Sequence, residues 1–164
     1  MNPAFIIIRR QPYEEPYHLR LVITASNGVF GGTLEYYCNA LDLIDMGTKL
    51  MAFPASIGDS YSYELGSPRP EDRFAFHFVL RAYTMDSSGH CALHISLNNN
   101  RREPDDSSCS FSIRTEASAI NRLGHLLKTF GKLKHRTLRW SEKSGDLLIS
   151  DSEPGADPLD WISS

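Results

Sequence analysis

The sequence predicts an α+β fold: a mostly antiparallel, twisted sheet of six to seven strands with two helices packed on one face. Three observations lead to this prediction. They are a long hairpin pattern over residues 73–97, a second hairpin pattern around Asn27-Gly28, and two amphipathic segments over residues 39–53 and 115–130. Alternating strands bury one face only, and helices with an apolar stripe are the elements that cover such a face.

The segment from Arg73 to Leu97 has the clearest pattern, because two alternating runs flank the turn D-S-S-G. If Asp86 lies opposite Gly89, the apolar side chains of both arms fall on one face. That face is predicted to hold Phe74, Phe76, Phe78, Leu80, Ala82, Cys91, Leu93, Ile95 and Leu97. The opposite face is polar and places Arg81 directly across from His94.

Asn27-Gly28 separates two further alternating runs, and both residues tolerate the positive φ of a type I′ turn. Pairing Ser26 with Val29 would bring Arg20 beside Glu35 as a cross-strand charge pair. Glycines inside the second run, at residues 31 and 32, indicate a bulge or a close packing contact, and we favour packing over the approach of a ligand.

Two helices are expected from their caps and stripes. Asn39 is a good N-cap for a helix that ends before Pro54, and Gly131 fits the left-handed position after the second helix. The second stripe consists of Ile120, Leu123, Leu127 and Phe130. Shorter strands are expected at Phe5–Ile8, Ser60–Leu65 and 109–115, with a last hairpin formed by Thr137–Trp140 and 146–150.

Length and composition indicate one ordinary domain. The chain has 164 residues, 41% hydrophobic and 23% charged, with a net charge of -3. We expect a single domain over residues 1–150 and an acidic, flexible tail over 151–164, in which Trp161 and Ile162 are the apolar residues able to dock. No apolar run is long enough to span a membrane. Three cysteines are too few for a disulfide scaffold, which favours reduced thiols and a cytoplasmic location.

Common catalytic and nucleotide-binding motifs are missing from the sequence: it has no P-loop, G-x-G-x-x-G, H-E-x-x-H, G-x-S-x-G or C-x-x-C. His90 and His94 share a strand face but lie ~13 Å apart at strand rise, too far to hold one metal ion. A general base would also need a carboxylate beside His94, and Glu35 is expected to pair with Arg20. We therefore expect a protein that is not an enzyme and uses no metal or cofactor.

Two surfaces are candidate sites. The polar sheet face offers side-chain types enriched at the centres of interfaces, and its candidate binding residues are Arg20, His77, Arg81, Tyr83, His94 and Arg114. A merely solvated sheet face is the alternative. A basic run is the alternative nucleic-acid patch, consisting of Lys128, Lys132, Lys134, Arg136 and Arg139. These cations also suit the C-terminus of a helix, so nucleic acid is the less favoured partner.

The order of landmarks over residues 18–130 resembles small bacterial immunity-type proteins, like those paired with wall-associated contact-dependent toxins. The resemblance lies in F-G-G-T-L-E-Y-Y running into A-L-D-L-I, in G-H-C-A-L-H-I, and in F-S-I-R-T-E-A-S-A-I-N-R-L. It implies a cytoplasmic, non-enzymatic protein that binds and neutralises a toxin. A small-molecule or nucleic-acid binding module is the alternative, and a second copy of the chain is another partner able to close the open face.

Overall fold

The computed structural model describes residues 2–149, which form nine strands and two α-helices. In chain order the elements are β1 (Phe5–Glu14), β2 (His18–Ser26), β3 (Gly31–Cys38), α1 (Ala40–Met51), β4 (Ser60–Gly66), the 3-10 turn η1 (Pro70–Asp72), β5 (His77–Thr84), β6 (Cys91–Asn98), β7 (Ser108–Thr115), α2 (Ala117–Phe130), β8 (Thr137–Ser141) and β9 (Gly145–Leu148).

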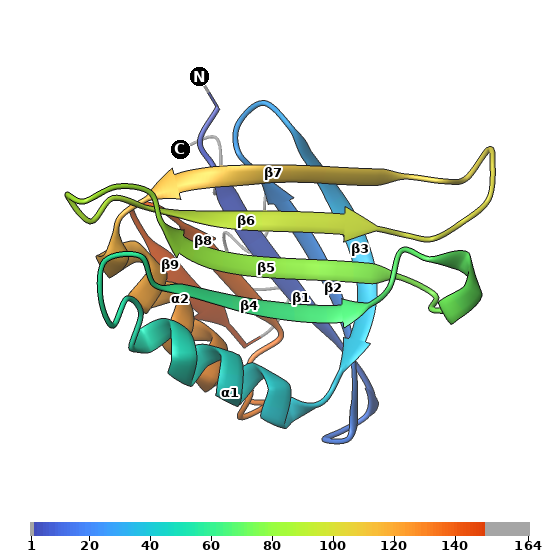
Figure 1. The fold of residues 1–164 in the computed structure, drawn as a ribbon. Helices are drawn as coiled ribbons and strands as arrows, with labels where there is room; N and C mark the ends of the chain where they lie inside the picture. Colours follow the sequence, from blue (N-terminus) through green and yellow to red (C-terminus); the bar gives the residue numbers. More distant parts are fainter. Residues whose placement is uncertain (1, 150–164) are drawn as a thin grey trace.

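The predicted α+β class and antiparallel pairing are confirmed, but the strands form two sheets where one sheet of six to seven strands was expected. Sheet A has the order β3-β2-β1-β8-β9, and sheet B has the order β4-β5-β6-β7 (Figure 1). Helix α1 separates β3 from β4 in the chain, and the last hairpin returns to pair with β1. Alternation of apolar and polar residues shows that a strand buries one face, but it does not show which element covers that face. The number of sheets therefore could not be predicted from it.

The central hairpin has the predicted register. Arg81 pairs with His94, and the amide of Gly89 donates to the carbonyl of Asp86 at 3.3 Å. Its first arm is shorter than expected, because β5 begins at His77 and Arg73 has the left-handed φ of 56°. Phe74 is consequently 53% exposed and does not join the predicted core row.

The β2–β3 hairpin is shifted from the predicted register by two residues. Ser26 pairs with Gly31, which leaves a four-residue loop, and the side chain of Asn27 accepts hydrogen bonds from the amides of Val29 and Phe30. A shift of two preserves which face is buried. Arg20 therefore still reaches Glu35, at 2.8 Å, although it pairs with Tyr37 along the strands.

The two helices pack closely against each other through glycines. Asn39 caps α1 as predicted, its side chain accepting from the amide of Asp42 at 2.8 Å. A Cβ on Gly124 would lie 2.7 Å from the carbonyl oxygen of Gly47, so only glycine permits this approach. Gly131 was expected to be left-handed but has the right-handed φ of -63°, and Leu133 takes a left-handed conformation instead.

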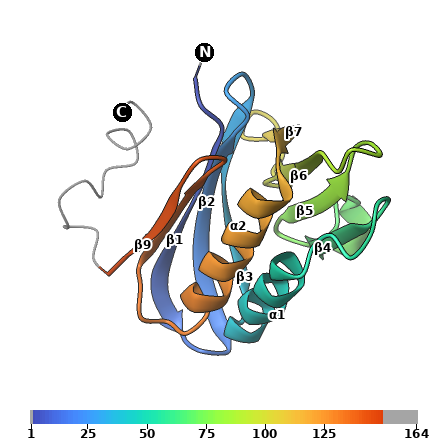
Figure 2. The same cartoon turned by 90° about the vertical axis from the view of Figure 1, so that its left-hand side faces the viewer.

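One hydrophobic core joins both sheets and both helices, which lie between the sheets (Figure 2). The rings of Tyr36 on sheet A and Phe78 on sheet B stack at 4.7 Å with 9° between their planes. The predicted stripe of α2 is fully buried in this core, and the indole of Trp140 donates to the carbonyl of Ala119 at 2.8 Å. The core gives the outer face of each sheet a rigid support.

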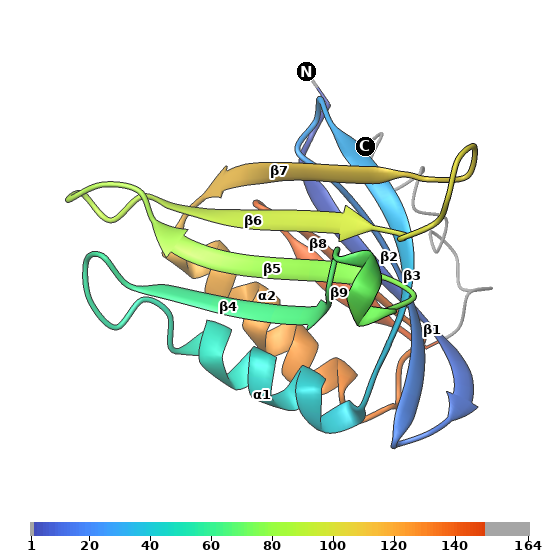
Figure 3. The same ribbon diagram turned by 45° about the vertical axis from the view of Figure 1, so that its right-hand side comes forward.

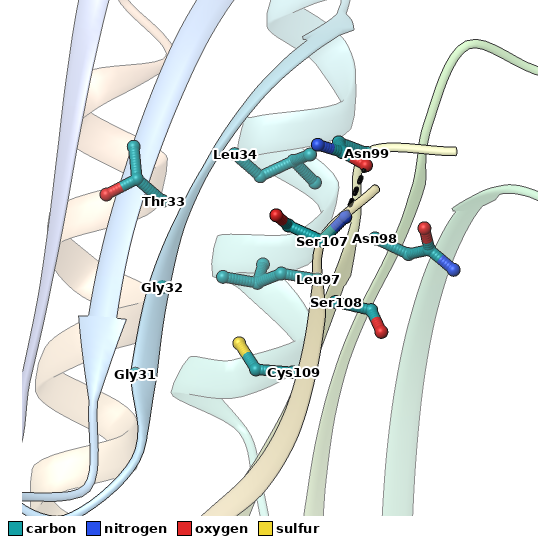
Figure 4. A pocket seen from close by; sticks show the side chains of 10 residues that line it. All are labelled: Gly31, Gly32, Thr33, Leu34, Leu97, Asn98, Asn99, Ser107, Ser108 and Cys109. Carbon is teal, nitrogen blue, oxygen red and sulfur yellow. Dashed lines mark hydrogen bonds between the residues drawn. The ribbon is translucent and has the colours of Figure 1, made fainter. Parts of the chain in front are cut away.

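The edges of the two sheets meet where β3 approaches β7, beside a small cleft of about 110 Å³ (Figure 4). A Cβ added to Gly32 would lie 2.9 Å from the sulfur of Cys109. In Figure 4 the amide of Ser107 donates to the side chain of Asn99, which orders the loop beside the cleft. Gly31 and Gly32 pair regularly with β2, so their role is close packing, as favoured from the sequence, without a bulge.

Two further expectations concern the chain ends and membranes. The predicted acidic tail, with Trp161 and Ile162, lies outside the described residues. Neither α1 nor α2, the helices of residues 2–149, is long and apolar enough to cross a membrane.

Candidate functional site

The outer face of sheet B is the surface turned away from the core, and it faces the viewer in Figure 1. Its rows run across the four strands, and the central row is Ser62, Arg81, His94 and Ser112. The neighbouring rows contribute Tyr83 with Arg114 on one side and Glu64 with Ser110 on the other, followed by His77, Asn98 and Ser108. Five of the six predicted face residues, all but Arg20, lie on this surface.

Arg81 and Tyr83 form the most prominent contact of this face. The guanidinium carbon of Arg81 lies 4.5 Å from the centroid of the Tyr83 ring, within the range of a cation–π interaction. The Tyr83 hydroxyl donates to the hydroxyl of Ser112 at 3.2 Å. This contact keeps an exposed cation and a half-buried ring in one orientation, which lowers the entropy lost when a partner binds.

His94 is held between two serines. Its Nδ1 lies 3.1 Å from the hydroxyl of Ser112, and its Nε2 lies 3.1 Å from the hydroxyl of Ser110. Because Tyr83 donates to Ser112, the consistent arrangement has Ser112 donating to Nδ1 and Nε2 donating to Ser110. A neutral imidazole satisfies this arrangement with one proton.

The electrostatics of His94 agree with the neutral form. Burial lowers the pKa of His94, and the nearby positive charge of Arg81 lowers it further. Among the described residues, the hydrogen-bond partners of its ring are hydroxyl groups and not carboxylates. A histidine held this way orders the face and lacks the acidic partner that orients a general base.

Acidic partners occur elsewhere on the same sheet and its turn. His77 Nε2 lies 2.7 Å from the carboxylate of Glu64. His90, in the β5–β6 turn, lies 2.8 Å from the carboxylate of Asp86, and this hydrogen bond raises the pKa of His90. Within residues 2–149, no group of three or more histidine, cysteine, aspartate or glutamate side chains is placed to hold a metal ion.

Arg20 is separated from the other predicted face residues, because it lies on β2 of sheet A. Its guanidinium pairs with Glu35, whose carboxylate also accepts from the Tyr37 hydroxyl at 2.9 Å. The hydrogen bond from Arg20 is the main cause of a lowered pKa at Glu35. The prediction that Arg20 joins the same face depended on a single sheet, and the division into two sheets makes it wrong.

The predicted basic patch is dispersed. Lys128 is half-buried on α2, while Lys132 and Lys134 are exposed on the connection to β8. Arg136 is half-buried, and Arg139 on β8 is 6% exposed and forms an ion pair with Asp146 at 2.5 Å. Because three of the five side chains are half-buried or buried, this segment does not present the continuous cationic stripe that phosphate binding requires.

Four arginines that the sequence analysis did not single out gather at one end of sheet B. Arg69 and Arg73, from the β4–β5 connection, and Arg101 and Arg102, from the β6–β7 loop, line a groove of about 870 Å³, called here the arginine groove. Figure 3 shows both connections at the same end of sheet B. The groove is continuous with the outer face of sheet B through Asn98 and Ser108, which belong to both.

Comparisons with known proteins add little to this description. No family model and no curated protein matches the sequence. Among solved structures, the chain is similar to the plant transcriptional regulator PBF-2, with 9% sequence identity, a TM-score of 0.43, and coverage of 80% of this chain and 76% of that chain.

Proposed function

We propose that this protein is a non-enzymatic binding protein whose outer face of sheet B contacts another protein. The observation that carries the proposal is the Arg81–Tyr83 contact at the centre of an ordered polar sheet face. Arginine and tyrosine are enriched among the residues that dominate binding energy. The serine hydroxyls around them offer hydrogen bonds without the desolvation cost of further charges.

The nature of the face also supports binding over catalysis. His94 has both ring nitrogens engaged by serines, and its lowered pKa favours the neutral ring. His77 is engaged by Glu64. A face with engaged imidazoles and an exposed arginine suits recognition of a complementary surface.

The resemblance to immunity-type proteins is the reason for naming a toxin-like polypeptide as the class of partner. This protein would neutralise the toxin by covering it.

The three cysteines, Cys38, Cys91 and Cys109, are free thiols, and burial raises the pKa of Cys38 to about 12. Burial also raises the pKa of Cys91 and of Cys109. Free thiols of low reactivity suit a reducing compartment, which supports the proposal of a cytoplasmic location.

The test compares what three tagged forms of the full chain retain from lysate of the native cells. The forms are the wild type, an Arg81→Ala/Arg114→Ala variant of the face, and a Lys49→Ala/Lys143→Ala control on other exposed surfaces. The proposal predicts one stoichiometric polypeptide bound by wild type and control and lost from the face variant. Equal retention by all three forms, or self-association as the only complex, would refute it.

A further inference from the structure

We propose that the arginine groove binds an acidic segment of the partner, one that presents several carboxylates. This inference rests on the proposed function, because the groove is continuous with the outer face of sheet B and would be covered by the same partner. The inference specifies the chemistry of the partner: the segment that contacts the arginine groove would carry negative charge.

Hydrogen bonds join the two connections that line the groove. The side-chain amide of Asn100 donates to the carbonyl of Ser67 at 2.8 Å and to the carbonyl of Phe74 at 3.0 Å. Asn100 takes the left-handed φ of 51°, and Arg73 that of 56°. Asparagine is one of the residues that adopt this conformation most readily, and its side chain reaches both Ser67 and Phe74 from there. The two connections that line the groove are therefore joined by hydrogen bonds within the protein itself.

Positive charge dominates the lining of the groove. Of its four arginines, Arg69 is partnered by Asp72 at 3.0 Å, and Asp106 is the acidic residue that also lines the groove. Arg73, Arg101 and Arg102 are exposed. The charge of Arg101 is felt at the edge of sheet A, where it adds a smaller contribution, after Arg20 and Tyr37, to the lowered pKa of Glu35. An anion in the groove would meet several guanidinium groups at once.

The arrangement of the cations favours carboxylates on a protein over a nucleic-acid strand. A single strand needs a basic track along which its phosphates run, with aromatic rings for its bases. Here the arginines cluster at one end, Phe74 is the aromatic residue among those that line the groove, and the rows next to the arginines contain serines and Glu64. The loop that supplies Arg101 also carries Glu103 and Asp105, and the whole chain has a net charge of -3.

Carboxylates fit the fork of an arginine side chain, which donates two parallel hydrogen bonds to them. The 53% exposed ring of Phe74 lies beside these charges and offers an apolar contact to the same segment. A peptide with glutamates next to an apolar residue would therefore use both parts of the groove.

The test measures binding of a labelled, glutamate-rich peptide to the full-length protein by fluorescence anisotropy. An Arg101→Glu/Arg102→Glu variant should weaken binding by at least about tenfold, or ~1.4 kcal/mol, and added salt should weaken binding to the wild type. A Lys49→Glu/Lys143→Glu variant is the control, because it makes the same change of charge on other exposed surfaces. Thermal unfolding checks that each variant is folded.

Three results would overturn the proposal: no peptide binding by the wild type, equal loss in both charge-reversal variants, or tighter binding of a thymine oligonucleotide of the same charge. The Arg81→Ala/Arg114→Ala variant separates this proposal from the previous one. It should keep its affinity for the peptide, since neither residue lines the groove. The two proposals can therefore fail separately. If the wild type binds the peptide but the Arg81→Ala/Arg114→Ala variant still captures every polypeptide from the lysate, the proposed function is refuted and the groove assignment stands.

Discussion

The guanidinium group of Arg81 lies over the ring of Tyr83, whose hydroxyl donates to Ser112, which in turn is hydrogen-bonded to His94. Four side chains from three strands are thereby linked on one exposed surface.

A first prediction follows from the exposure of Arg81. Arg81→Ala should weaken partner binding by at least about tenfold while changing the free energy of unfolding by no more than ~1 kcal/mol.

The same limit of ~1 kcal/mol is expected for His94→Ala, because its ring is only partly buried and its hydrogen bonds are to neutral serine hydroxyls. Urea unfolding of both variants checks these values. A much larger loss of stability would show that the face is buried against another part of the protein.

The titration of His94 provides a second prediction. Its pKa is lowered from the usual 6.5 by burial and by Arg81, so the unfolded chain takes up a proton at higher pH than the folded one. His94 therefore contributes to a loss of stability as the pH falls through about 6.5 toward its folded pKa, and to no further change below that value. Arg81→Ala should move the pKa of His94 upward, which NMR titration of its ring protons measures.

His90 serves as the internal control for that titration. Its pKa is raised by the hydrogen bond to Asp86 and by that charge, so the two histidines should titrate on opposite sides of 6.5. Its stabilising contribution is present at low pH and lost as the pH rises through its folded pKa. Asp86→Asn should lower the pKa of His90 without moving that of His94. A shift of both resonances would contradict the assignment.

The contact between the helices gives a third prediction. Gly124→Ala should destabilise the fold by roughly 1–3 kcal/mol, because the new methyl group would meet the amide nitrogen of Met51 at 2.5 Å. The higher helix propensity of alanine offsets only about 1 kcal/mol of the clash. Thr48→Ala, an exposed change on α1, should be neutral or slightly stabilising. Thermal unfolding measures both, and a Gly124→Ala protein as stable as wild type would rule out this close packing.

A fourth prediction concerns the nearly buried guanidinium of Arg10. This side chain is 6% exposed, pairs with Glu15 at 2.5 Å, and donates to the carbonyls of Leu133 and His135. Arg10→Met should cost about 3 kcal/mol, because it leaves a partly buried carboxylate and two carbonyls without their donor. Adding Glu15→Gln should recover part of this loss, as measured by urea unfolding. A double variant less stable than Arg10→Met would contradict the ion-pair account.

The sequence was sufficient to predict elements whose register is set locally. The D-S-S-G turn and the alternation of both arms place Arg81 opposite His94, and the structure has that pair. The apolar stripe of α2 and the N-cap at Asn39 could also be predicted from the local sequence. The four-residue loop after Ser26 could not be predicted in this way. Asn-Gly also fits a two-residue turn, and only long-range packing decides between the two loop lengths.

The number of sheets and the arginine groove depend on relationships that no local pattern contains. A strand shows the same alternation whether it belongs to one large sheet or to one of two packed sheets. For this reason Arg20, which lies on sheet A, was predicted to join residues that lie on sheet B. The groove joins residues about 30 positions apart through the hydrogen bonds of Asn100. Its arginines lie in irregular segments, where sequence periodicity gives no orientation.

Site-specific photo-crosslinking tests the central claim most directly, namely that the outer face of sheet B binds another protein. A photoreactive amino acid replaces Ser62, the exposed residue paired with Arg81 on the face, or Lys49 on α1, and the full-length variants are irradiated in the native cells. One discrete crosslinked polypeptide is expected from position 62 and none from position 49. Crosslinks of equal yield at both positions, or none at position 62, would contradict the claim.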